Sequence, residues 1–208
     1  MNSSKPSSPL APWDSAFAER SRLHVARNVD LYAPGDTSDS VYLVESGAIV
    51  EIRTDATGVS HAVGLSGPGS LLGARLTTGH QLTHSVRATA LIDSVVREMK
   101  RDDFLHATLL NPDLSTAYMR EMSKRLEAAR ILTDTCSAST TGDHILGVLH
   151  AIATSFGVGR NGSSSVSVRN DLLEQMTGTP HRLFEATIHE LGSHGLVQLE
   201  KDGVRWVA

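Results

Sequence analysis

The chain has little of several features that would point to specific chemistry. Its 208 residues include one cysteine, Cys136, which excludes an internal disulfide and the four thiolates of an iron–sulfur cluster. No run approaches the roughly 18 consecutive apolar residues of a membrane-spanning helix, and the opening MNSSKPSSPLAP has no apolar stretch typical of a signal peptide. We therefore expect a cytoplasmic protein without membrane contact, whose single thiol stays reduced.

Catalytic motifs and an excess of positive charge are also missing. The sequence contains no P-loop, dinucleotide fingerprint or nucleophile elbow. Its ten histidines form no His-x-His pair of the kind that holds a metal in cupin enzymes. We expect no enzyme. The formal net charge of −4 gives no global attraction to nucleic acid, so any such contact requires a local patch.

Short alternating apolar runs broken by glycine follow the first 12 residues. Two strands are predicted around Glu45-Ser46-Gly47, with a further turn at residues 55–58. The stretch SVRATALIDSVVREM predicts two more strands hinged near Asp93. Many short strands at regular spacing favour a sandwich, jelly roll or barrel.

A long helix is predicted after these strands. Asn111-Pro112-Asp113 is typical of a helix start. An apolar stripe with helical spacing then covers one side of five or six turns: Leu114, Tyr118, Met122, Leu126, Ala129 and Leu132. Such a helix either lies on the preceding domain or pairs with a second copy in a coiled coil, and we favour the dimer because another module follows.

The last module, residues 137–208, has the pattern of a helix–turn–helix with a terminal hairpin. An amphipathic helix, a Gly/Ser loop, a short strand and two short helices precede a hairpin that turns at residues 201–203. Thr179 and Pro180 fit the N-cap and first position of the second helix. That helix has one apolar face (Phe184, Ile188, Leu191) and one polar face (His181, Arg182, Glu185, His189). In a helix–turn–helix, the N-terminal residues of the second helix contact base edges.

The charge of this module argues against strong phosphate binding. From residue 137 onward five basic side chains face seven acidic ones, a net charge of −2, whereas DNA affinity comes largely from phosphate neutralisation. Helix–turn–helix sequences also occur as packing units. A dimeric regulator that works through protein contacts without DNA therefore remains an alternative.

The order of these parts resembles the cyclic-AMP receptor protein/FNR superfamily of bacterial transcription regulators. The resemblance runs from about residue 23 to the C-terminus, and its most specific pieces are YAPGDTSDSVYLVESGAIVEI, NPDLSTAYMREMSKRLEAA and the stretch from Gly178 to Leu196. It implies an α+β chain: a tail (1–12), a jelly-roll-like β-roll sensor (13–110), a dimerisation helix (111–136) and a winged helix–turn–helix (137–208). It also implies a homodimer on a near-palindromic operator of double-stranded DNA, with RNA polymerase as a candidate partner.

The resemblance assigns roles to individual residues. The dimer interface would include Leu114, Tyr118, Met122, Leu126 and Ala129. The DNA contacts would be Arg169, Asn170, Thr179, His181, Arg182, Glu185, His189 and Lys201, with Arg205 also near phosphates. Arg182 stands where the family commonly has glutamate, and Ala186 where it has a guanine-binding arginine, so we expect Arg182 to be the main base contact.

The effector pocket implied by the resemblance has lost its charged contacts. It would be formed by Gly73, Ala74, Arg75, Leu82, Thr83 and Ala129. Ala74 replaces the glutamate that binds the ribose, and Leu82-Thr83 replaces the Arg-Ser pair that binds the cyclic phosphate, whose burial without a cation is costly. We expect no cofactor and no binding of cyclic AMP. A haem held by His24, His61, His80 or His84, or another small molecule, remains an alternative.

Overall fold

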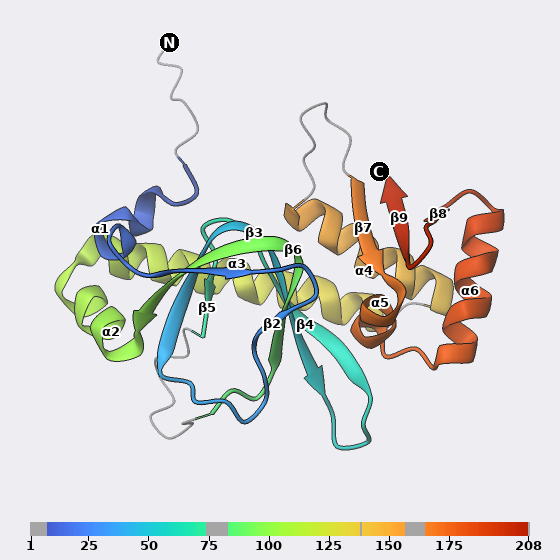
Figure 1. Ribbon diagram of the computed structural model, residues 1–208, viewed down its shortest axis with the longest axis horizontal. Helices are drawn as coiled ribbons and strands as arrows, with labels where there is room; N and C mark the ends of the chain where they lie inside the picture. Colours follow the sequence, from blue (N-terminus) through green and yellow to red (C-terminus); the bar gives the residue numbers. More distant parts are fainter. Residues whose placement is uncertain (1–7, 74–82, 138, 157–164, 208) are drawn as a thin grey trace, which may run out of the picture. The chain divides into compact units, whose positions relative to one another are not determined.

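The computed structural model describes residues 8–73, 83–137, 139–156 and 165–207 (Figure 1). Its residue contacts divide the chain into two compact units, one of residues 1–49 and 66–125 and the other of residues 50–65 and 126–208. Helices and strands both contribute, with the strands concentrated in the N-terminal half. The expected α+β class is confirmed.

The N-terminal half is built on an antiparallel sheet. Its strands are β1 (Arg22–Val25), β2 (Asp30–Tyr32), β3 (Ser40–Thr54), β4 (Ser60–Ser66), β5 (Leu71–Leu72) and β6 (Arg87–Lys100). Their order is β1-β6-β3-β4, with β2 paired to β6 and β5 paired to β3.

Two of these strands are longer than the sequence predicts. The expected turn at Glu45-Ser46-Gly47 lies inside the continuous strand β3, because Gly47 accommodates a φ of 96° there and a Cβ at this position would overlap Ser94. The expected hinge at Asp93 likewise lies inside β6. The turn at residues 55–58 is confirmed, with the Gly58 N–H donating to the Asp55 carbonyl at 3.1 Å.

Aromatic side chains fill the core of the first unit. The 3-10 helix η1 (Ala11–Trp13) and helix α1 (Asp14–Phe17) bring Trp13 and Phe17 to Phe104 on α2 (Arg101–Leu110), with ring centroids 6.2 and 5.9 Å apart. The Trp13 indole donates to the Gly69 carbonyl at 2.8 Å. All three rings are at most 2% exposed, so burial of apolar surface stabilises this arrangement. The sequence pattern predicts neither α1 nor α2.

Helix α3 (Pro112–Cys136) begins where the sequence predicts. The Asn111 side-chain oxygen accepts from the Asp113 N–H at 3.0 Å, which satisfies one of the free donors of the first turn. Farther along α3, Glu121 and Arg125 bind the two backbone groups of one β5 residue. The Leu71 N–H donates to Glu121 at 3.3 Å and the Leu71 carbonyl accepts from Arg125. Glu121 is 5% exposed, so the edge of β5 is completed by side chains.

The apolar stripe of α3 packs partly within its own chain. Leu114 lies in the aromatic core at 3% exposure, and Tyr118 and Met122 pack against the same core. The first three turns of α3 therefore pack on the core of their own unit, and the assignment of these residues to the dimer interface stays a prediction. Two apolar side chains of α3 are more than half exposed. Met119 is 61% exposed, and Leu126, seven residues later, is 58% exposed. Ala129 is half-buried.

The C-terminal elements form a small helical domain with a three-stranded sheet. They are α4 (Thr141–Phe156), β7 (Ser165–Arg169), α5 (Asn170–Thr177), α6 (His181–Ser193), β8 (Gln198–Leu199) and β9 (Gly203–Val207). The sheet order is β7-β9-β8, with antiparallel pairing. The predicted apolar face of α6 is confirmed, since Phe184 and Leu191 are buried, and the amphipathic helix α4 buries Ile145 and Leu149.

Candidate nucleic-acid interface

The turn between α5 and α6 depends on a glycine. Gly178 follows the last turn of α5 with a φ of 62°, the left-handed conformation that glycine adopts without a steric penalty. Thr179 is buried, at 8% exposure, and Pro180 stands at the N-cap of α6. Pro180 has a non-helical ψ of 136°, and its carbonyl accepts from the N–H groups of Leu183 and Phe184 at 2.9 Å each. The N-cap is therefore Pro180, which corrects the prediction of Thr179.

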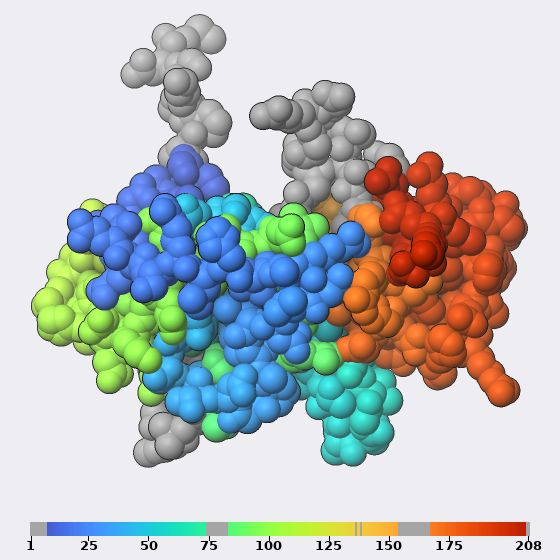
Figure 2. Space-filling view, in the orientation of Figure 1, coloured from blue at the N-terminus to red at the C-terminus, as the bar shows by residue number. Residues whose placement is uncertain are grey.

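Helix α6 has two faces of opposite character. Phe184, Ile188 and Leu191 are between 1% and 6% exposed and form the inner face. His181, Arg182, Glu185 and His189 are all exposed. The surface that α6 and the β8–β9 hairpin present is drawn in orange to red in Figure 2.

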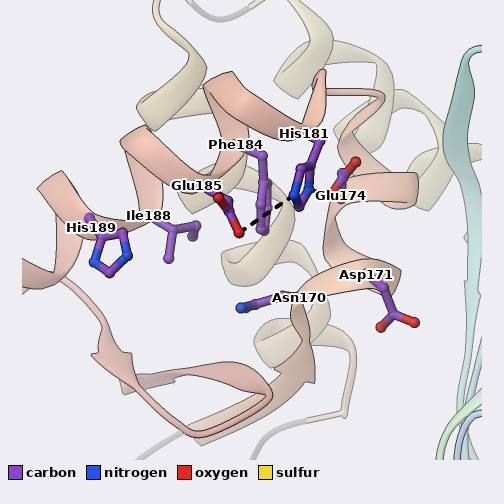
Figure 3. A pocket seen from close by; sticks show the side chains of 8 residues that line it. All are labelled: Asn170, Asp171, Glu174, His181, Phe184, Glu185, Ile188 and His189. Carbon is purple, nitrogen blue, oxygen red and sulfur yellow. Dashed lines mark hydrogen bonds and ion pairs between the residues drawn. The ribbon is translucent and has the colours of Figure 1, made fainter.

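A pocket of about 220 Å³ lies between α5 and α6 (Figure 3). Its lining residues are Asn170, Asp171, Glu174, His181, Phe184, Glu185, Ile188 and His189. The lining therefore combines three carboxylates and two imidazoles over an apolar floor.

His181 lies between two carboxylates, one from each helix. Its Nδ1 is 2.9 Å from Glu174 Oε2 on α5, and its Nε2 is 3.5 Å from Glu185 Oε1 on α6. The hydrogen bond to Glu174, and then the negative charges of Glu174 and Glu185, raise the pKa of His181 above its usual value. No sequence pattern singles out Glu174, because its distance from His181 is set by the turn at Gly178.

Two of the predicted phosphate contacts are engaged by acids of the same domain. Arg169 pairs with Asp171 through a double contact, with Nε 2.8 Å from Oδ1. The pairing raises the pKa of Arg169 and lowers that of Asp171. In the terminal hairpin, Arg205 Nε lies 3.0 Å from Glu200 Oε1. These arginines are therefore partly neutralised.

The remaining predicted contacts lie around the same face. Arg182 and Lys201 are exposed, and neither has an ion-pair partner among the residues that the structure describes. The Asn170 N–H donates to the Asp202 carbonyl at 3.1 Å, which ties α5 to the hairpin. The Asn170 side-chain oxygen is buried, with no hydrogen-bond partner within the described part of the chain.

The predicted effector pocket is described only in part. Gly73 has a φ of 71°, and a Cβ there would lie 2.6 Å from the Ser40 carbonyl oxygen. Thr83 is exposed and forms an antiparallel bridge with Thr37. Ala74, Arg75, Leu82 and His80 lie outside the described residues. Ala129 belongs to the other unit.

The histidines considered as haem ligands have different surroundings. His84 is 8% exposed and stacks on Tyr32, with ring centroids 3.7 Å apart. His24 is exposed on β1, and His61 on β4 is half-buried. In the described ranges, His, Cys, Asp and Glu form no group of three suited to a metal ion. None of the helices there is long and apolar enough to cross a membrane.

Known proteins resemble this chain in sequence. Residues 22–109 match the family described as cyclic nucleotide-binding domain. The chain is 24% identical over 193 residues to the cyclic AMP receptor protein of Thermus thermophilus, covering 91% of this chain and 86% of that protein. It is 26% identical over 133 residues to the global nitrogen regulator of Nostoc sp. PCC 7120, covering 64% of this chain and 60% of that protein.

Solved structures share the fold. The c-di-GMP responsive global regulator CLP of Xanthomonas campestris matches with a TM-score of 0.76 at 19% identity, covering 94% of this chain and 98% of that one. A CRP-family transcriptional regulator of Thermus thermophilus matches with a TM-score of 0.71 at 16% identity, and the match covers 88% of this chain and 90% of that one. These likenesses extend over both units of the chain.

Proposed function

We propose that the chain is a transcription regulator of the cyclic-AMP receptor protein/FNR type, which it resembles in sequence and fold, and that it binds near-palindromic DNA as a homodimer, with α6 as its recognition helix. The observation that carries the proposal is the two-sided character of α6. Its inner face is buried in the domain core, and its outer face exposes hydrogen-bonding side chains from the first turn onward. A recognition helix in the major groove needs this arrangement.

Arg182 is the proposed main base contact. It is exposed in the first turn of α6, and no carboxylate pairs with it among the described residues. A bidentate arginine–guanine contact contributes about 1–3 kcal/mol of discrimination. Lys201 is proposed to bind phosphate from the hairpin. Arg169 would do so after exchanging Asp171 for a phosphate oxygen.

The proposed dimer is formed by apolar side chains that α3 leaves exposed, Leu126 of the predicted stripe and Met119 outside it. Met119 and Leu126 are seven residues apart on one side of α3 and more than half exposed, the spacing of a coiled-coil seam. A two-fold dimer would present its two α6 helices to half-sites about one helical turn apart.

We further propose that the β-roll does not respond to cyclic AMP. Two of the similar proteins are named for cyclic AMP and c-di-GMP. In this chain, however, Ala74, Leu82 and Thr83 offer no charge for a cyclic phosphate. Calorimetric titration of the protein with cyclic AMP should give no binding heat, and saturable micromolar binding would contradict the proposal.

The test of DNA binding is a mobility-shift series with DNA from the region upstream of the protein's own gene. We expect a retarded complex whose affinity falls steeply with salt, since phosphate contacts release counterions. Arg182→Ala should reduce selectivity for the operator over random DNA by roughly 5- to 150-fold. Arg53→Ala, which removes a cation outside residues 137–208, should leave it unchanged.

A regulator that acts through protein contacts is the second candidate. The net charge of −2 and the pairing of Arg169 and Arg205 with acids favour it. Absence of any retarded complex at low salt, with intact dimers, would support this candidate and refute DNA binding.

A further inference from the structure

The pocket between α5 and α6 contains a three-residue bridge that the family resemblance does not assign. Glu174 on α5, His181 at the start of α6 and Glu185 one turn later form a continuous chain of contacts of 2.9 and 3.5 Å (Figure 3). A neutral imidazole has one N–H, whereas both ring nitrogens of His181 face carboxylate oxygens. Only the protonated ring donates to both.

The bridge changes which residues are available to DNA. The resemblance implies a base contact for His181, but both of its nitrogens are directed at carboxylates of its own domain. Glu185 has a side chain that is 63% exposed and uses one oxygen, Oε1, toward His181. Its second oxygen has no partner among the described residues and can accept a hydrogen bond from a ligand on the outer side of α6.

The chemistry of the major groove determines what that ligand is. A carboxylate accepts only, so it is repelled by the N7 and O6 acceptors of guanine and matches the N4 amino group of cytosine. Building on the proposed function, we propose that Glu185 is a specificity-determining residue that accepts a hydrogen bond from cytosine N4, and that His181 positions it by bridging it to Glu174.

The protonation state of His181 changes the negative charge that this face of α5 and α6 presents to DNA. The charged and titratable groups that face His181 are Asp171 and Glu174 on α5 and Glu185 and His189 on α6; the described part of the hairpin contributes no residue to the pocket. Protonation of His181 reduces the charge of the Glu174–His181–Glu185 group from −2 to −1. Since DNA is a polyanion, binding should favour the protonated bridge and take up a proton.

The first experiment selects binding sites from a randomised duplex library with the full-length protein. We expect cytosine at one position of each half-site, and replacement of that cytosine by thymine should weaken binding about 5- to 150-fold. Glu185→Gln should lose the cytosine preference, with adenine gaining because glutamine pairs with adenine N6 and N7. The Arg182-dependent guanine preference should remain. Glu190→Gln, an equal change of charge on the same helix outside the pocket, is the matched control and should keep the wild-type site.

The second experiment measures binding to the selected duplex by fluorescence anisotropy between roughly pH 6 and 8. Wild-type affinity and cytosine discrimination should both increase as the pH falls through the pKa of His181. His181→Gln should flatten this pH profile and reduce discrimination at the cytosine. Circular dichroism would verify that each variant is folded, and Glu174→Gln should weaken the pH dependence as an independent check on the bridge.

The outcomes separate the inference from the proposed function. Absence of any DNA binding overturns both. Binding with an unchanged cytosine preference in Glu185→Gln overturns the role of Glu185 alone. An unchanged pH profile and unchanged discrimination in His181→Gln overturn the positioning role of His181.

Discussion

The cluster of Glu45, Arg97 and Arg22 offers a quantitative test of the structure of the first unit. Glu45 Oε2 lies 2.7 Å from Arg97 Nε and 2.8 Å from Arg22 Nε. Hydrogen bonds from Arg97 and then Arg22 lower the pKa of Glu45 from 4.5 to about 2. The side chains of Glu45 and Arg97 are 22% and 12% exposed, whereas that of Arg22 is 56% exposed. We therefore predict that Glu45→Gln destabilises this unit in a pH-dependent way.

The expected loss of stability follows from the pKa shift of Glu45. One pKa unit corresponds to about 1.36 kcal/mol, so the complete shift would correspond to about 3.4 kcal/mol. Arg22 is exposed, so water screens its ion pair with Glu45 and reduces its contribution. We therefore expect Glu45→Gln to lower the free energy of unfolding by about 2 kcal/mol at pH 7. The lowered pKa means that the carboxylate stabilises the folded state above pH 4.5 and that this contribution disappears as the pH falls toward 2. Less than about half of the effect should remain near pH 3.

The assay uses the position of one tryptophan in each unit. Trp13 lies in the aromatic core of the first unit, and Trp206 packs edge-on to His150 in the second. In a Trp206→Phe background, urea unfolding followed by Trp13 fluorescence therefore reports on the first unit. Glu19→Gln, an exposed substitution in the same unit, is the control. An equal loss of stability from Glu45→Gln at pH 3 and pH 7 would refute the electrostatic reasoning.

Three further predictions concern α3, α5 and the turn. Leu126→Glu should convert the dimer to monomer in sedimentation velocity, because it places a charge on the exposed stripe; a persistent dimer would show that another surface pairs. Asp171→Asn should strengthen DNA binding, because Arg169 no longer has to exchange an acid for a phosphate oxygen, and adding Arg169→Ala should reduce the slope of log affinity against log salt by about 0.9; an unchanged slope on adding Arg169→Ala would show that Arg169 does not contact DNA. Gly178→Ala should destabilise the second unit by at least about 1–2 kcal/mol, because its φ is 62° and a Cβ there would also lie 2.5 Å from the His61 ring carbon Cε1. Gly142→Ala, where a Cβ would meet Leu191 at 3.6 Å, should not be destabilising, and calorimetry compares the two.

Sequence patterns identify the helices of the second unit well because each has a regular apolar face. Ile145 and Leu149 on α4 and Phe184 and Leu191 on α6 recur at helical spacing, and all four are buried. Helix α2 escapes such reasoning, since Leu109 and Leu110 at its end are more than 70% exposed and leave no clear stripe. Pattern reasoning divides strand β3 in two because glycine after Glu-Ser normally indicates a turn.

In the candidate site, the sequence predicts which residues are exposed but not which of them pair. The exposed face of α6 follows from spacing alone, but the pairing of its charges does not. Glu174 and His181 are separated by a left-handed glycine turn, and only the folded turn brings them to 2.9 Å. The same holds for α3. The spacing of Leu114 and Tyr118 predicts an apolar face, but it does not determine that this face packs on the β-roll.

The contacts of α3 with β5 have a mechanical consequence. Glu121 and Arg125 are one helical turn apart, and together they occupy the amide and the carbonyl of Leu71. The helix therefore has only one rotational setting that satisfies both groups. A twist of α3 about its axis leaves a buried amide without an acceptor, two residues before Gly73. A rotation of α3 at this point would therefore have to break both hydrogen bonds to Leu71.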